Sequence, residues 1–140
     1  MRIVVLAAAL LSVSLGVPAA DLITADNNPI RLTQTIKNGT LHVAMKNVSH
    51  RPILAYVVGV ESDRQADTHH DYFTGRDAFG PGKTIELLFA VQAGSSMPKV
   101  FVDYVRLSDS STWGSPVTDD GKDVAASFQR KLSIDNDLTH

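Results

Sequence analysis

The chain of 140 residues contains no cysteine, and this absence excludes several functions at once. Without thiolates there is no disulfide, no cysteine-ligated metal, no thiol redox pair and no cysteine nucleophile. A lipid anchor of the bacterial lipoprotein kind, which needs a cysteine directly after the signal segment, is excluded as well. A domain of this size is large enough to fold without disulfides, so its stability has to come from an ordinary hydrophobic core.

Glutamate is scarce, and positive charge is not concentrated in any part of the chain. Glu61 and Glu86 are the only glutamates among 15 acidic residues, and 13 lysines and arginines leave a net charge of −2. Aspartate favours turns and helix caps over helix interiors, so this acid usage points to a loop-rich β protein. Nucleic acids and anionic membranes require clustered basic residues, and the composition predicts neither as a partner.

Long hydrophobic runs are missing except at the start of the chain. Arg2 precedes an apolar run over residues 3–15, and small residues follow up to Ala20. This is the layout of a secretory signal segment, with cleavage after either Ala19 or Ala20. At about 13 residues, the run is too short to span a bilayer. We therefore expect residues 1–20 to be a signal peptide and the remainder to be soluble, secreted or periplasmic, without a membrane anchor.

Alternating apolar and polar residues predict short strands through the middle of the chain. Residues 21–29 are expected to form a polar N-terminal arm, and Asn38-Gly39 is a hairpin turn signal. The expected strands cover residues 30–36, 41–45, 53–60, 85–91, 100–107 and 111–113, with a further short strand at 72–73. The continuous apolar run 53–60 predicts a strand covered on both faces. The polar stretch 61–80 is expected to be the least regular part.

The end of the chain has the pattern of one amphipathic helix. Its apolar stripe consists of three residues spaced by four: Val124, Phe128 and Leu132. Asp120 is the expected N-cap, with Asp123 three residues later as in a capping box. Arg130 and Lys131 are expected near the C-terminal end of the helix, which favours cations, and residues 135–140 are expected to fray.

Several short strands with regularly spaced turn signals indicate a mainly β fold. We predict an immunoglobulin-like antiparallel β-sandwich over residues 30–114, followed by a C-terminal helix and tail over residues 115–140. Trp113 is expected to be a packing anchor under the helix; the alternative is a carbohydrate-stacking platform shared with Tyr72. The predicted core consists of Leu41, Val43, Ile53, Ala55, Val57, Ile85, Leu87, Phe89, Val100, Val102, Tyr104 and Trp113.

Three stretches resemble bacterial exported domains. Residues 41–49 (LHVAMKNVS) look like the strand-then-Asn element of immunoglobulin-like domains, including the CARDB type, and residues 81–89 (PGKTIELLF) resemble their Pro-Gly turn and following strand. Residues 102–114 (VDYVRLSDSSTWG) are similar to small exported bacterial proteins of the acidobacterial type. The resemblance implies a β-sandwich and export. It carries no catalytic residue, and it leaves the activity open.

His69, His70 and Asp71 form the densest group of candidate metal ligands in the sequence. Neighbouring residues of a strand point to opposite faces, so both histidines reach one ion only from a bent loop. Further ligands would have to come from Asp67, Asp77 or His42, and no spacing in the sequence requires it. The alternative interpretation, a solvated polar loop between two strands, is the one we favour.

Three other patterns bear on chemistry. Residues 119–123 (DDGKD) lack the alternating order and distal glutamate of a calcium loop, so we interpret them as a turn and a helix start. No G-x-S-x-G elbow marks a serine nucleophile. Asn38 and Asn47 each begin a glycosylation sequon.

The sequence therefore favours an exported, non-enzymatic binding or accessory protein with no cofactor, whose partner is another envelope or extracellular protein. The expected binding surface is an exposed sheet edge or the stretch 61–80. One alternative is a metal-dependent protein or hydrolase that uses His69, His70 and Asp71. Another is an envelope component that acts only by self-association.

Overall fold

The computed structural model describes residues 27–74 and 78–138, with side chains described as far as Lys131. The expected signal peptide, most of the polar arm and Asp77 lie outside the described residues.

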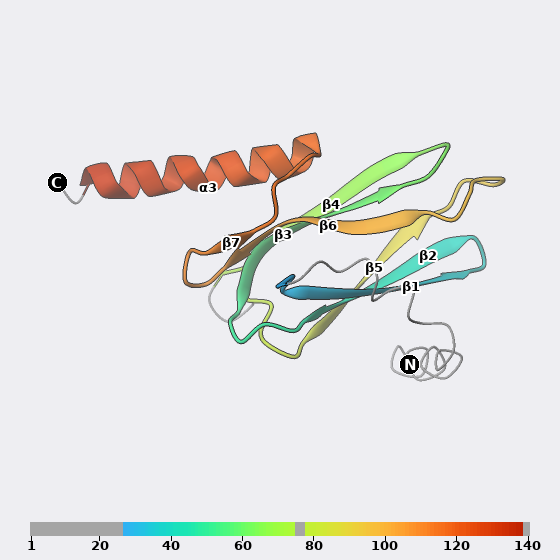
Figure 1. The fold of residues 1–140 in the computed structure, drawn as a ribbon, viewed down its shortest axis with the longest axis horizontal. Helices are drawn as coiled ribbons and strands as arrows, with labels where there is room; N and C mark the ends of the chain where they lie inside the picture. Colours follow the sequence, from blue (N-terminus) through green and yellow to red (C-terminus); the bar gives the residue numbers. More distant parts are fainter. Residues whose placement is uncertain (1–26, 75–77, 139–140) are drawn as a thin grey trace.

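Two antiparallel sheets face each other and form a β-sandwich (Figure 1). The first sheet has the order β1-β2-β5 and consists of β1 (Ile30–Lys37), β2 (Thr40–Asn47) and β5 (Thr84–Ala90). The second has the order β4-β3-β6-β7 and consists of β4 (Ala66–Tyr72), β3 (Ile53–Glu61), β6 (Lys99–Leu107) and β7 (Thr112–Trp113). The helix α3 (Asp119–Leu138) follows. The prediction of a mainly β sandwich with a C-terminal helix is confirmed.

The main core lies between the two sheets and follows the predicted alternation. In β2, Leu41, Val43 and Met45 are fully buried, while the residues between them face outward. Burial of such side chains contributes roughly 1.5–3 kcal/mol each. The predicted core is confirmed except at Ile85 and Trp113, which are only partly buried and pack against its margin.

Strand β3 is buried on both faces, as its unbroken apolar sequence predicted. Tyr56 and its alternate neighbours point into the sandwich, whereas Ala55 and Val57 belong to a second cluster under α3. The second cluster also contains Tyr104 and Val124, and Phe128 packs against it. Two residues of the predicted helix stripe are thereby confirmed; the side chain of the third, Leu132, lies outside the described part.

Trp113 is a packing residue, but it does not lie under the helix. It pairs with Val105, a residue of the core between the sheets, and it packs against that core. Tyr72 is 52% exposed and lies in β4, at the other edge of the same sheet. The strands β3 and β6 lie between β4 and β7. The two rings therefore form no shared carbohydrate platform, and the helix is placed by other residues.

Helix α3 begins next to a β-bulge in β6, at which the carboxylate of Asp103 is buried. Between Val57 and Val58 of β3 the register with β6 shifts by one, so Asp103 is the extra residue of a β-bulge. Its carboxylate accepts hydrogen bonds from the backbone N–H groups of Val117 (2.9 Å) and Thr118 (3.1 Å) and from the Thr118 hydroxyl (2.5 Å).

The N-cap is consequently Thr118, and the prediction of Asp120 as N-cap is wrong. Thr118 Oγ1 accepts a hydrogen bond from the backbone N–H of Gly121 at 2.9 Å, the N3 position of the helix. A Cβ at Gly121 would overlap the Asp103 carboxylate, so a glycine lets the first turn lie directly on the bulge. The helix also continues to Leu138, so Arg130 and Lys131 lie about two turns before its end. The expectation that the chain frays from residue 135 is therefore wrong for residues 135–138.

Figure 1 shows α3 along the outer side of the four-stranded sheet, with its C-terminal end extending beyond the sandwich. Among the described residues, no helix is long and apolar enough to cross a membrane.

The prediction that residues 61–80 are irregular is wrong for a large part of that stretch. Residues 66–72 form β4, which pairs with β3 along its whole length. The strand lies at the edge of its sheet and buries none of its side chains fully. It therefore lacks the apolar alternation by which a half-buried strand is recognised in a sequence.

Asn47 is fully buried and joins three segments of the chain. Its side-chain amide donates to the carbonyls of Arg51 and Phe79, both at 2.8 Å, and its side-chain oxygen accepts from the Ser49 N–H at 2.9 Å and the Ser49 hydroxyl at 2.7 Å. Its backbone pairs with the turn before β5 through Gly82 and Lys83. The sequon at Asn47 is therefore inaccessible in the folded protein, whereas the sequon at Asn38 lies in an exposed turn.

Replacing Asn47 by alanine should lower the free energy of unfolding by about 2–4 kcal/mol, because the carbonyls of Arg51 and Phe79 each lose one hydrogen bond and the Ser49 N–H loses its acceptor. Urea denaturation of Asn47→Ala and of the unchanged chain measures the difference. Thr35→Ala, an exposed position on β1, serves as the control and should stay within about 0.5 kcal/mol. Equal losses in the two variants would show that the Asn47 hydrogen bonds contribute no special stability.

Candidate functional site

Within the described part of the chain, the outer edge of β4 exposes backbone groups that no other strand pairs. The bonds Ser62 N–H to Gln65 O (2.8 Å) and Phe73 N–H to Leu54 O (2.7 Å) fix which residues of β4 bond to β3. Hydrogen bonding alternates along an antiparallel ladder, so the odd-numbered residues of β4 face β3 and the even-numbered ones face outward. The outward residues are Ala66, Thr68, His70 and Tyr72.

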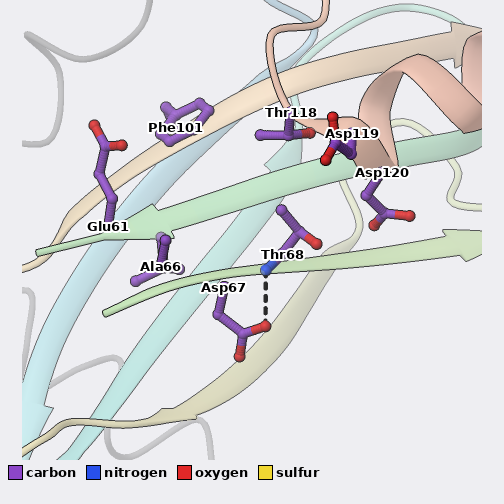
Figure 2. A pocket seen from close by; sticks show the side chains of 9 residues that line it. Glu61, Ala66, Asp67, Thr68, Phe101, Thr118, Asp119 and Asp120 are labelled. Atoms are coloured by element: carbon purple, nitrogen blue, oxygen red, sulfur yellow. Dashed lines mark hydrogen bonds between the residues drawn. The ribbon is translucent and has the colours of Figure 1, made fainter. Parts of the chain in front are cut away.

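One of these outward donors is already occupied by the chain itself. The Asp67 carboxylate accepts a hydrogen bond from the backbone N–H of Thr68 at 2.8 Å, drawn as a dashed line in Figure 2. A charged side chain folded over its own strand edge is one way in which proteins discourage uncontrolled strand pairing. Asp67 engages this one of the four outward N–H groups of β4.

A groove of about 320 Å³ lies beside this edge, on the face of the sheet that carries α3 (Figure 2). The tip of the Phe101 ring lies over β3, because Gly59 beneath it has no side chain; a Cβ there would overlap the ring. The first turn of α3 forms one end of the groove through Asp119 and Asp120, and Glu61 stands at the other end. The groove is therefore acidic around an aromatic floor.

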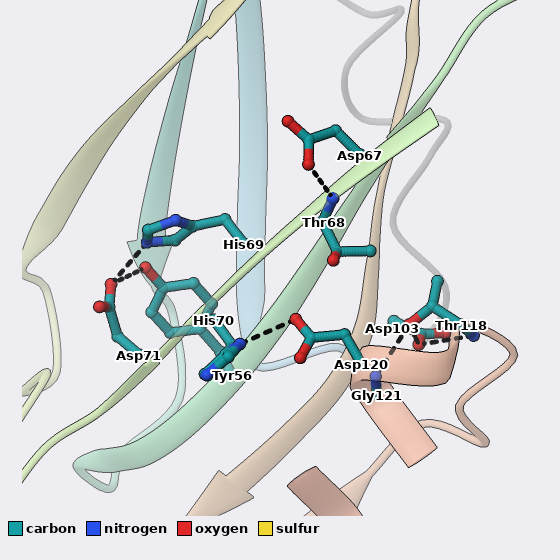
Figure 3. A network of polar contacts seen from close by, with 10 residues as sticks. All are labelled: Tyr56, Asp67, Thr68, His69, His70, Asp71, Asp103, Thr118, Asp120 and Gly121. Carbon is teal, nitrogen blue, oxygen red and sulfur yellow. Dashed lines mark hydrogen bonds and ion pairs between the residues drawn. The ribbon is translucent and has the colours of Figure 1, made fainter. Parts of the chain in front are cut away.

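The structure separates the two histidines that the sequence singled out (Figure 3). His69 pairs with Val58 and lies on the face toward the other sheet, whereas His70 pairs with Val57 and lies on the face toward α3. Both are in a regular strand and not in a loop, so the alternation of strand side chains decides their placement. A single ion bound by both is therefore not favoured by this geometry.

His69 joins Asp71 and Tyr56 in one small network. Asp71 Oδ2 accepts a hydrogen bond from the Tyr56 hydroxyl at 2.5 Å and lies 3.0 Å from His69 Nε2 (Figure 3). The Tyr56 side chain is fully buried, while His69 and Asp71 are about two-fifths exposed. Burial raises the pKa of the Tyr56 hydroxyl well above its usual value, and the hydrogen bond to Asp71 and its negative charge act in the same direction.

His70 belongs instead to the contact between β4 and α3. Its Nδ1 lies 2.8 Å from Asp120 Oδ2, in the first turn of the helix. Its ring meets Tyr72 edge-on at 5.4 Å, and Tyr72 in turn lies 6.0 Å from Phe128. Arg106, almost completely buried, places its guanidinium 4.2 Å from the Phe128 ring centroid. These contacts attach the helix to the edge of the sheet.

The other candidate metal ligands are not brought to this place. His42 points outward from β2 in the opposite sheet, and Asp67 is engaged with Thr68. Among the described side chains, in residues 27–74 and 78–131, no group of three or more His, Asp or Glu is arranged to hold a metal ion. The aspartates of the stretch 119–123 lie in the first helical turns, in accordance with the interpretation of that stretch as a helix start.

Sequence reasoning missed the groove, because its walls come from three distant segments. Glu61 and Thr68 flank the β3–β4 turn, Phe101 lies on β6, and the aspartates begin α3. The one available signal was Gly59 within an otherwise continuous apolar strand, since glycine in a strand often marks a close approach.

No known relative decides the function. No model of a protein family matches the sequence, and no curated protein does. The resemblance to CARDB-type domains and to acidobacterial exported proteins therefore stays a prediction.

Tyr56 should make the stability of the protein depend on pH in the alkaline range. Above a pH of about 10 the unfolded chain releases the Tyr56 proton while the folded chain retains it, so the free energy of unfolding falls as the pH rises, by up to about 1.4 kcal/mol per pH unit. Tyr56→Phe should fall less steeply than the unchanged chain in urea denaturation at pH values from about 9.5 to 11. Tyr72→Phe, at an exposed tyrosine, should keep the original slope. Identical slopes for all three proteins would contradict the assignment.

Removing the Asp103 carboxylate should loosen α3 selectively. Asp103→Ala leaves the N–H groups of Val117 and Thr118 without their acceptor and should cost about 2–3 kcal/mol of unfolding free energy. Amide hydrogen exchange should accelerate in α3 more than in β2, which is remote from the bulge. Asp123→Ala, an exposed change in the same helix, is the control. Unchanged exchange in α3 would show that the helix is held by its apolar face alone.

Proposed function

We propose that this chain is an exported, non-enzymatic binding or accessory protein that receives an extended segment of a partner protein along the free edge of β4. The observation that carries the proposal is the free edge itself. Among the described residues β4 is a seven-residue strand with a neighbour on one side, and its outward backbone groups, apart from the Thr68 N–H that Asp67 occupies, are available for a further strand. Addition of a peptide strand to a sheet edge is a common mode of recognition.

The proposed surface unites two regions that the sequence suggested separately. The stretch 61–80 and an exposed sheet edge were alternative binding surfaces, and in the structure β4 belongs to both. Tyr72, 52% exposed at the end of β4, adds an aromatic side chain of the kind enriched in protein interfaces.

The other long edges are less suited to this role. The outward carbonyl of Ala90 in β5 already accepts a hydrogen bond from Gln65 Nε2 at 3.0 Å, and β7 has only two residues. Strand β1 has lysine or arginine near both of its ends, at Arg31 and Lys37, and such charges discourage strand addition.

Location outside the cytoplasm is part of the proposal. The layout of residues 1–20 supports it, with Arg2 before an apolar run and small residues up to Ala20. We propose that the protein acts in the periplasm or outside the cell, and that its partner is another envelope or extracellular protein.

Blocking the edge of β4 should abolish partner recovery. Thr68→Pro replaces the outward N–H that Asp67 occupies by a pyrrolidine ring, which obstructs an incoming strand while leaving the bonds to β3 in place, and edge strands tolerate such a substitution. A pull-down from the envelope fraction of the producing cell should recover the partner with the unchanged chain and at least about tenfold less with Thr68→Pro. Ala66→Pro provides a second block at the first residue of the strand, for the case that Thr68→Pro unfolds.

Ile36→Pro is the matched control, because the ladder between β1 and β2 places its N–H on the free edge of β1. It should recover the partner as the unchanged chain does. Recovery that survives both β4 variants but is lost with Ile36→Pro would move the binding surface to β1. Failure of the unchanged chain to recover any specific partner would remove the proposal.

A further inference from the structure

We propose that the segment received by β4 is basic: an extended peptide of a partner protein that places a lysine or arginine side chain in the acidic groove beside the strand. This inference rests on the proposed function and adds the chemistry of the partner. Three observations support it, namely the position of the groove relative to the edge, its charge, and a cation that the chain itself places there.

The groove lies where a side chain of an added strand arrives. Thr68 is an outward-bonding residue of β4, and its side chain lies in the groove. A strand added to β4 lies about 4.8 Å away, and the residue opposite Thr68 points to the same face of the sheet. The four-carbon stem of a lysine, or the longer stem of an arginine, is sufficient to carry its charge from there toward the first turn of α3.

The carboxylates of the groove differ in how far they are already engaged. Asp120 lies against His70 and Asp67 accepts from the Thr68 N–H, but Asp119 is exposed at the start of the helix. Glu61 is exposed at the opposite end. The groove therefore carries carboxylates at both ends and an aromatic ring, Phe101, between them, and Asp119 is the exposed carboxylate at the helix end.

Lys99 already shows the type of contact expected of the partner. Its ammonium lies 5.9 Å from the centroid of the Phe101 ring and 3.9 Å from Glu61 Oε1. A cation over an aromatic face, with a carboxylate nearby, is a favourable arrangement for a long basic side chain. Lys99 pairs with Glu61 at one end of the groove. Asp119, at the helix end, is therefore the carboxylate that a cation of the partner would pair with.

A second copy of this chain fits the edge less well. Antiparallel pairing of two β4 strands would bring Asp67 and Asp71 of each copy near those of the other, along a strand that contains no lysine or arginine. Like charges on paired strands are destabilising. A partner segment with basic residues has the complementary charge, and dimerisation of the chain is one of the outcomes that the test distinguishes.

Three synthetic peptides test the inference with the full chain. The first is a ten-residue strand-forming peptide that alternates threonine and lysine; the second has glutamate in place of lysine; the third is the lysine peptide with alternate backbone amides methylated. Binding is measured by fluorescence anisotropy at low salt, and amide hydrogen exchange locates the bound peptide. The lysine peptide should bind and protect the outward amides of β4, and the other two should not.

Paired variants of the chain test the groove. Glu61→Gln combined with Asp119→Asn should weaken binding of the lysine peptide by about fivefold, and added salt should reduce the difference. Glu86→Gln combined with Asp109→Asn removes the same charge at positions that do not line the groove and should leave binding within about twofold of the unchanged chain.

The outcomes separate the inference from the proposed function. Equal binding of the lysine and glutamate peptides, or equal loss in the two double variants, overturns the basic partner but leaves strand addition intact. Equal binding of the methylated and unmethylated lysine peptides means attraction by charge alone and counts against strand addition itself. Absence of binding by every peptide, while Thr68→Pro still loses the partner in the pull-down, refutes only the inferred charge of the partner. A mass that doubles with concentration and does not with Thr68→Pro identifies a second copy as the occupant.

Discussion

The buried carboxylate of Asp103 is the constraint on which the outer half of the structure depends. A carboxylate is costly to bury unless it is fully hydrogen-bonded, and here its three donors all belong to the segment that leads into α3. The position of the bulge in β6 therefore fixes the position at which the helix begins. The position of the helix then decides that Asp120 meets His70 and that Asp119 closes one end of the groove.

The helix also solves a problem that the central strand creates. β3 is apolar on both faces, so a two-layer sandwich alone would leave Ala55 and Val57 in water. The first part of α3 covers them together with Tyr104, and the contact extends through Phe128 to Tyr72 at the sheet edge. The edge strand β4 is thus supported from the helix side while its outward backbone groups stay accessible. This combination of a firm support and an open edge is what a binding surface requires.

Much of the fold could be predicted because burial leaves a direct trace in the sequence. β2 and β5 each have one buried face, so apolar residues recur at every second position, and β3, buried on both faces, is continuously apolar. β4 could not be recognised in the same way, since an edge strand of polar residues has neither pattern. The start of α3 was misplaced because Thr118 owes its capping role to Asp103, fifteen residues earlier in the chain.

The candidate site shows the same limit. Opposite placement of His69 and His70 follows from strand alternation alone, once the residues are known to be in a strand. The Tyr56–Asp71–His69 network and the acidic groove depend on register and on the docking of α3, which no local pattern records. Gly59 was the one local sign, and its meaning becomes clear only with Phe101 lying over it.

The burial of Asn47 sets an order of events for any host that glycosylates exported proteins. The side-chain nitrogen of Asn47 donates hydrogen bonds to the carbonyls of Arg51 and Phe79. The same nitrogen is the atom that would carry a glycan. A chain modified there before folding cannot complete these bonds, and a chain that has folded can no longer be modified. At this position, folding and glycosylation are competing and mutually exclusive fates, whereas Asn38 in its exposed turn is compatible with both.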